Sequence, residues 1–369
     1  MRNVDRDTFF RLYSTEVSYF SAKVRPALRY KRLPFVDLLS TTEAFRKVIR
    51  PRTGLTFIPI LITPDDEVLQ DTSQILDELE RRYPDPPLFP LTPVQRVVSL
   101  LWELYCDEFM LLPALHYRWS FPESEAKARA DFAASTGDVA MATRFADRVK
   151  SFLPVVGVVP ATIPAIEAHT RELLGDLEAH FRERRMLLGD RMSIADLALV
   201  GPLYPHLYLD AWPGRMMRET APLVCHWIER VNHPDPDDRG EWLPGDALAP
   251  TMRPMLERIG SDAVPMLVDT VRDWERWAET EASGVDELPR SIGFHATKLR
   301  GVDLQRTTSP YAVWMVQRSL DAYRSLSDAD RASVDRALAG TGCEALLALE
   351  PRHRVGKRGF VLVVDRSGR

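Results

Sequence analysis

The chain has 369 residues, of which 45% are hydrophobic and 27% charged, a composition typical of a soluble globular protein with two or three domains. Its formal net charge is −5, so nothing in the composition indicates binding to nucleic acid or to an acidic membrane surface. No apolar run approaches the ~20 residues of a membrane-spanning helix, the N-terminus lacks a signal-peptide core, and the three cysteines are far apart. We therefore expect a cytoplasmic protein without a disulfide framework.

The first 90 residues alternate between strand and helix signals. Short apolar runs of strand length occur four times, at residues 8–13, 33–39, 56–63 and 68–69. Apolar residues also recur every three or four positions in two stretches, 19–31 and 72–83, which predicts two helices. This order of elements predicts a small α/β domain over residues 1–90.

A proline-rich linker, residues 84–90, leads into a region in which strand signals nearly vanish. Helical patterns continue through four stretches, 94–115, 126–152, 165–185 and 220–231. They predict an all-helical domain over residues 91–249. Within it, Ser193 and Asp196 have the spacing of a capping box, and we expect the substitution Asp196→Ala to cost about 1 kcal/mol of stability.

The last third of the chain carries weaker signals. Helices are predicted within 254–281, 311–323 and 329–338, and a short strand at 359–364. The segment 352–369 is locally basic, and we interpret it as a solvated tail. Residues 250–369 are thus predicted to form a mostly helical C-terminal extension, to which the sequence assigns no role.

Five segments carry motifs in a recognisable order. They are Leu12–Ser14, Ser18–Arg25 with Leu28, Ile58–Leu61, Leu69–Thr72 with Ile75, and Leu187–Asp196. Through them, the chain from Thr8 to about Pro234 resembles the glutathione S-transferase superfamily. The resemblance implies a thioredoxin-like, glutathione-binding N-terminal domain followed by the all-helical domain of that family. The extension from about residue 250 is an addition that most members lack.

The resemblance places Ser18 where the family carries its catalytic serine or cysteine. Ser18 lies between a predicted strand and a helix start, where backbone N–H groups and the helix dipole favour an anion. A hydroxyl that donates to the sulfur of glutathione stabilises the thiolate and lowers the pKa of the thiol. An N-cap is the purely structural alternative, and the nearby hydroxyls stay open as substitutes: Ser14, Thr15 and Ser21.

Two further contacts with glutathione follow from the resemblance. The Ile58–Pro59 bond is expected to be cis, and the backbone of Ile58 to pair with the cysteinyl segment of the ligand. Asp71 and Thr72 match the pair that holds the γ-glutamyl end. Asp71 is then expected to take the ammonium group, while Thr72 and the N–H groups of the helix start bind the carboxylate.

Phe57 departs from the family pattern. Members often place a polar residue just before the Ile/Val-Pro pair, and a phenyl ring cannot make that contact with the ligand. The contact with the glycyl end is then expected from Arg50 or Arg52.

The pocket for a second substrate is expected on the long helix after the linker, at Tyr105, Phe109, His116 and Trp119. Aromatic residues at helical spacing are also typical of a core, and a lone histidine such as His116 usually does not act as an acid or base. No Ser/His/Asp set, phosphate-binding loop or metal cluster is apparent in the sequence.

Together these motifs indicate a glutathione transferase-like enzyme, in which Ser18 activates glutathione, the co-substrate, for attack on a small electrophile. Glutathione-dependent isomerisation or dehalogenation begins with the same thiolate and stays open. The other alternative is a non-catalytic GST-like binding or scaffold protein, favoured by Phe57 and by the extension. A homodimer is expected from the family, with no nucleic-acid or membrane partner.

Overall fold

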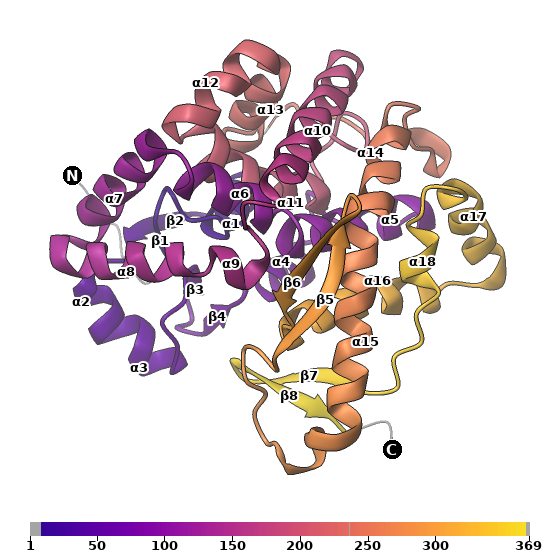
Figure 1. Cartoon of the computed structure of the whole chain (residues 1–369). Helices are drawn as coiled ribbons and strands as arrows, with labels where there is room; N and C mark the ends of the chain where they lie inside the picture. Colours follow the sequence, from indigo (N-terminus) through magenta and orange to yellow (C-terminus); the bar gives the residue numbers. More distant parts are fainter. Residues whose placement is uncertain (1–8, 236, 367–369) are drawn as a thin grey trace.

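The computed structural model describes residues 9–235 and 237–366 (Figure 1). Its N-terminal sheet has four strands, β1 (Phe10–Ser14), β2 (Phe35–Leu39), β3 (Ile60–Ile62) and β4 (Val68–Gln70). The spatial order is β2-β1-β3-β4, with β1 parallel to β2 and antiparallel to β3, and with β4 antiparallel to β3. A parallel pair needs a crossover, which helix α1 (Ser21–Tyr30) supplies. Thr8, where the sequence predicted the first strand to begin, lies outside the described residues.

Both faces of this sheet are covered, because successive side chains of a strand point to opposite faces. On one face, residues of β1 and β3 pack with apolar residues of α1 and α4 (Thr72–Arg82). On the other face, Ile60 and Ile62 pack against a segment built from α2 (Thr42–Ala44), a π-helical turn (Phe45–Ile49) and α3 (Arg50–Thr53). Strand β3 is shorter than predicted, since Pro59 has no N–H to contribute to the ladder.

The region after the linker is helical, as predicted. Its helices are α5 (Pro93–Glu108), α6 (Leu111–Trp119), α7 (Pro122–Thr136), α8 (Val139–Ser151), α9 (Leu153–Val156), α10 (Ile163–Glu183), α11 (Ile194–Leu203), α12 (Ala211–Thr220) and α13 (Pro222–Asn232). The predicted helix 94–115 is broken into α5 and α6 because Pro113 cannot donate to the carbonyl of Phe109, which instead accepts from Leu112. Within the described residues, no helix combines the length and hydropathy needed to cross a bilayer.

The capping box predicted at the start of α11 is confirmed. The Asp196 carboxylate accepts hydrogen bonds from the N–H and the hydroxyl of Ser193, at 2.9 and 2.8 Å. It also accepts from the N–H of Leu187 at 2.9 Å and from the indole N–H of Trp227 at 3.2 Å. Asp196 is fully buried and therefore holds together α11, α13 and the segment before α11.

The C-terminal extension is mostly helical, as predicted. It contains α14 (Met252–Arg258), α15 (Val264–Glu281), α16 (Pro310–Arg324), α17 (Asp328–Leu338) and α18 (Glu344–Leu347), and two hairpins, β5 (Phe294–Leu299) with β6 (Val302–Thr307) and β7 (Arg354–Arg358) with β8 (Val361–Asp365). Helices α16 and α17 pack on α5, and their apolar side chains belong to the same core as those of the helical domain. Figure 1 shows both hairpins beside α15 and α16.

The sequence did not predict the hairpin β5–β6. Its strand β5 alternates exposed and buried residues, but the buried positions are His295, Thr297 and Leu299, so two of the three are polar. Polar residues on the buried face hide the apolar alternation that marks a strand.

Candidate functional site

The last residues of β1 and β4 and the first residue of β3 lie side by side at one end of the strands, which we call the sheet edge. Tyr13 of β1 lies opposite Ile60 of β3, and Ile60 lies opposite Gln70 of β4. Because β1 and β4 run toward this edge and β3 runs away from it, the segments that follow β1, precede β3 and follow β4 are neighbours. These segments carry the residues predicted to contact glutathione: Ser18, Ile58, Pro59, Asp71 and Thr72.

Ser18 lies in the turn between β1 and α1. Its hydroxyl oxygen accepts a hydrogen bond from the N–H of Ser21 at 3.3 Å, and its own N–H donates to the carbonyl of Thr15 at 3.2 Å. Ser18 thus stabilises the start of α1. A hydroxyl that accepts through one lone pair still has its proton to donate, so this contact leaves Ser18 able to donate to a ligand.

The neighbouring hydroxyls are less available. The Ser14 hydroxyl donates to Asp37 and accepts from the guanidinium of Arg25 at 2.9 Å. Thr15 and Ser21 are buried, and the Ser21 hydroxyl has no hydrogen-bond partner among the described residues. Ser18 is half-buried, whereas Ser14, Thr15 and Ser21 are buried.

The Ile58–Pro59 peptide bond is cis, as the resemblance implies. Pro59 is buried and Ile58 is half-buried. The ring of Phe57, just before them, is covered by the guanidinium of Arg290, whose Cζ lies 3.4 Å from the ring centroid. Burial lowers the pKa of Arg290. A cation from the extension therefore covers the position at which the family often has a polar contact with its ligand.

The two arginines expected at the glycyl end differ in their surroundings. Arg52 is paired with Asp66, at 2.9 Å between Nη1 and Oδ1. Asp66 lies in the β3–β4 turn, at the opposite end of β3 from Pro59, so this pair holds Arg52 away from the predicted site. Arg50 is exposed.

Asp71 is the N-cap of α4, with a φ of 77° and a ψ of 124°, outside the left-handed helical region. Its Oδ1 accepts from the N–H groups of Ser73 at 3.0 Å and Gln74 at 3.4 Å. Its Oδ2 lies 3.1 Å from Nζ of Lys357 on β7. Both carboxylate oxygens are therefore engaged by groups of the protein itself. Thr72, the first residue of α4, is buried.

Lys357, like Arg290, contacts this site without having been predicted from the sequence. Its side chain is 11% exposed, and its Nζ lies 3.6 Å from the ring centroid of Trp314 on α16. Burial lowers the pKa of Lys357, while the Asp71 carboxylate opposes that shift. The interpretation of segment 352–369 as a solvated tail is wrong for this residue, because pairing of β7 with β8 holds Lys357 against the rest of the chain.

A buried network of ion pairs lies behind Asp71. Nζ of Lys23 on α1 is 2.6 Å from Oδ2 of Asp107 on α5 and 3.7 Å from Oε1 of Glu103. Glu103 also accepts from the hydroxyl of Ser73 at 2.6 Å and from Arg318 on α16 at 3.2 Å. Loss of any one partner would leave an uncompensated buried charge. The network therefore ties the N-terminal domain, the helical domain and the extension together.

Two adjacent carboxylic acids of α5 have raised pKa values. Burial raises the pKa of Asp107 to about 6, with Lys23 opposing, and raises the pKa of Glu108 to about 8, with Arg306 of β6 opposing. A guanidinium N–H of Arg306 donates to the carbonyl of Glu108 at 3.3 Å. The sequence shows this pair only as two consecutive carboxyls at the end of a helix that also contains Arg96 and Glu103.

The residues predicted for the second-substrate pocket lie in the interior. Each has no more than 2% of its surface exposed: Tyr105, Phe109, His116 and Trp119. The Tyr105 hydroxyl and His169 Nε2 are 2.6 Å apart, and His169 Nδ1 is 2.8 Å from an oxygen of Asp262. The ring of Tyr105 also stacks on that of Phe109. Their aromatic pattern thus contributes to the packed interior of the helical domain.

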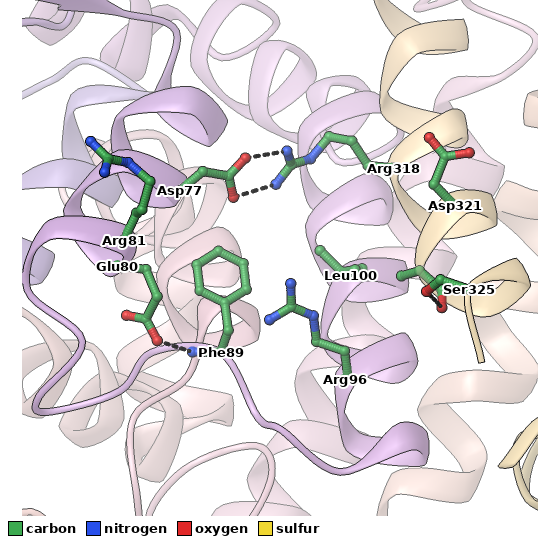
Figure 2. Close-up of a pocket in the computed structure, with 10 residues that line it drawn as sticks. Asp77, Glu80, Arg81, Phe89, Arg96, Leu100, Arg318, Asp321 and Ser325 are labelled. Atoms are coloured by element: carbon green, nitrogen blue, oxygen red, sulfur yellow. Dashed lines mark hydrogen bonds and ion pairs between the residues drawn. The ribbon is translucent and has the colours of Figure 1, made fainter. Parts of the chain in front are cut away.

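A cavity of about 490 Å³ lies between α4, α5 and α16. Figure 2 shows Asp77 and Arg318, two of its lining residues, facing each other; Nη1 and Oδ2 are 2.5 Å apart. Its lining also includes Phe89 and Arg96, whose guanidinium lies 4.7 Å from the Phe89 ring centroid. None of the residues predicted for substrate or glutathione lines this cavity. In the described part of the chain, no group of three or more His, Cys, Asp or Glu side chains is placed to hold a metal ion.

Two family models match the chain. The model of the glutathione S-transferase N-terminal domain matches residues 12–87, and that of the glutathione S-transferase C-terminal domain matches residues 162–235. A curated relative, glutathione S-transferase psoE of Aspergillus fumigatus, is 30% identical over 87 residues. That match covers 23% of this chain and 36%, about a third, of the relative.

Solved structures with a similar arrangement include a glutathione S-transferase from Rhodospirillum rubrum, 20% identical, with a TM-score of 0.43 over 67% of this chain and 92% of that one. Another is a glutathione S-transferase from Methylobacterium radiotolerans in complex with glutathione sulfonate, 24% identical, with a TM-score of 0.40 over 64% of this chain and 96% of that one. The two domain matches follow the order and the positions of the motifs in the sequence. Residues 12–87 and 162–235 are therefore similar to the N-terminal and C-terminal domains of glutathione S-transferases.

Proposed function

We propose that the chain binds glutathione at the edge of the N-terminal sheet and activates its thiol at Ser18 for attack on a small electrophile. The convergence of Ser18, the cis Ile58–Pro59 bond and the Asp71–Thr72 pair at one sheet edge supports this proposal. Ser18 is half-buried at a helix start and has a proton to donate. A donor aimed at the sulfur stabilises the thiolate relative to the thiol.

Binding is tested by the free energy of unfolding with and without millimolar glutathione. Glutathione at 100 times its Kd should add about 2.7 kcal/mol, because it binds the folded chain and not the unfolded one. A chain whose stability does not change at any glutathione concentration up to the millimolar range would refute the proposal.

Activation is tested with Ser18→Ala. This variant should keep the stabilisation by glutathione but lose the ultraviolet absorbance of the bound thiolate near neutral pH. Ser21→Ala is the matched control, since it removes a neighbouring hydroxyl that is buried. If Ser21→Ala, rather than Ser18→Ala, abolishes the thiolate signal, the role belongs to Ser21.

A second candidate is a non-catalytic GST-like binding or scaffold protein. Two observations favour it: Lys357 is paired with Asp71, and Arg290 covers Phe57, so cations of the extension already contact two parts of the glutathione site. This candidate predicts no stabilisation by glutathione in the experiment above. A homodimer and a cytoplasmic location stay predictions from the sequence.

A further inference from the structure

Lys357 presents an ammonium group to the Asp71 carboxylate inside the predicted glutathione site. The Nζ–Oδ2 distance is 3.1 Å, and the two side chains are 11% and 9% exposed. The rings of Trp314 and Tyr311 lie 3.6 and 5.3 Å from Nζ and shield the pair. A cation over aromatic faces is stabilised by their quadrupoles, so this position suits an ammonium group.

Hydrogen bonds to α15 and α16 fix the position of the β7–β8 hairpin, which carries Lys357. Both backbone groups of Val355, two residues earlier, bond to the side-chain amide of Gln317 on α16, each at 2.8 Å. The indole N–H of Trp274 on α15 donates to the carbonyl of His353 at 2.9 Å. Beyond Lys357, the chain turns at Gly359, which has a φ of 58°, and returns as β8. The fold of the extension therefore delivers this ammonium group to Asp71.

Each carboxylate oxygen of Asp71 already has a partner within the protein. Oδ1 is used by the N–H groups that start α4, and Oδ2 by Lys357. A ligand ammonium directed to Asp71 must displace Nζ of Lys357 or share one oxygen with it. Sharing would bring two positive charges together at a poorly solvated site, which is costly.

We propose that Lys357 is an internal competitor for the ammonium group of the thiol ligand, so that the extension limits binding of glutathione through its γ-glutamyl end. This inference rests on the proposed function. Binding through Asp71 is open only to the fraction of molecules in which Lys357 has moved away, and the apparent Kd rises in inverse proportion to that fraction. A ligand that lacks the ammonium group does not compete with Lys357 and escapes this penalty.

The experiment compares two ligands by isothermal titration calorimetry of the full chain: glutathione, and its analogue in which hydrogen replaces the α-amino group of the γ-glutamyl residue. Wild type should bind the two within about threefold of each other. Lys357→Met, which keeps an unbranched side chain over Trp314, should bind glutathione about tenfold or more tightly than wild type does. The same variant should bind the analogue within about threefold of wild type.

The matched control is Lys298→Met. Lys298 belongs to the same extension and pairs with Asp303 at 2.8 Å, but it is largely exposed. Its loss should leave both affinities unchanged. Equal glutathione affinity in wild type and Lys357→Met would overturn the competition while leaving the proposed function intact.

The two proposals fail in different ways. If neither wild type nor Lys357→Met binds either ligand, the proposed function fails, and this inference fails with it. If Lys357→Met does not fold, wild type alone decides: a tenfold preference for glutathione over the analogue would show that Asp71 is open to the ligand ammonium, against the inference.

Discussion

Removal of the Asp196 carboxylate should destabilise the chain far more than loss of an ordinary helix cap. Asp196→Ala leaves three buried N–H donors without their acceptor, those of Leu187, Ser193 and the Trp227 indole; the Ser193 hydroxyl loses its acceptor too, but it can rotate. A buried donor left unpaired costs roughly 1–3 kcal/mol. Burial raises the pKa of Asp196, so removing the carboxylate also relieves part of its desolvation cost. We therefore take the low end for each donor and expect a loss of about 3 kcal/mol.

The assay is urea unfolding of wild type and variant at pH 7, followed by circular dichroism, with the slope m compared between them. Asp138→Ala is the matched control, because Asp138 caps α8 through a single hydrogen bond from Met141, at 2.9 Å. That control should lose about 1 kcal/mol. If Asp196→Ala loses no more stability than Asp138→Ala, the reasoning from the buried donors is refuted.

Two further predictions concern a buried acid and a tight backbone contact. Glu108 should hold its proton in the folded chain up to about pH 8, whereas the unfolded chain releases it near the ordinary value of 4.5. Folding stability then falls as the pH rises through this window, by at most about 1.4 kcal/mol per unit, and Glu108→Gln abolishes this loss. Urea unfolding at pH 5 and pH 8 should show that the variant gains stability relative to wild type as the pH rises. The same stability difference between variant and wild type at both pH values would contradict the raised pKa of Glu108. Gly260→Ala should cost about 3 kcal/mol or more, since its Cβ would lie 1.9 Å from the carbonyl oxygen of Thr341. Gly284→Ala, with no atom within 4 Å of its Cβ, should stay within about 0.5 kcal/mol of wild type in thermal unfolding, and equal losses in the two variants would argue against the contact.

The N-terminal domain could be predicted closely because its signals are local. Helix α4 begins where hydroxyl and carboxyl side chains can cap it, and the strands alternate or run apolar over short stretches. The cis bond at Pro59 came from the family resemblance, and the structure bears it out. The order of the predicted glutathione contacts along the chain came from the family resemblance. Their convergence depends on the register of β1, β3 and β4, which pairs residues far apart in the sequence.

The aromatic residues of α5 and α6 illustrate the limit of such arguments. Helical spacing is the same for a side chain that faces a pocket and for one that faces a neighbouring helix. Tyr105 meets His169, which is 64 residues away, and Asp262 lies beyond that histidine. Only the packing of α10 and the segment after α14 decides that this face of α5 is interior.

The sequence by itself determined the two family domains, the order of their elements and the capping box at Ser193 and Asp196, because each depends on residues close together in the chain. Only the tertiary structure showed that Lys357 forms an ion pair with Asp71. Lys357 follows it by 286 positions, in a segment whose local pattern is that of an exposed basic tail. The pairing of β7 with β8 and their attachment to α15 and α16 turn this lysine inward. Ion pairs between distant residues carry no local signal, because they are set by the packing of whole elements.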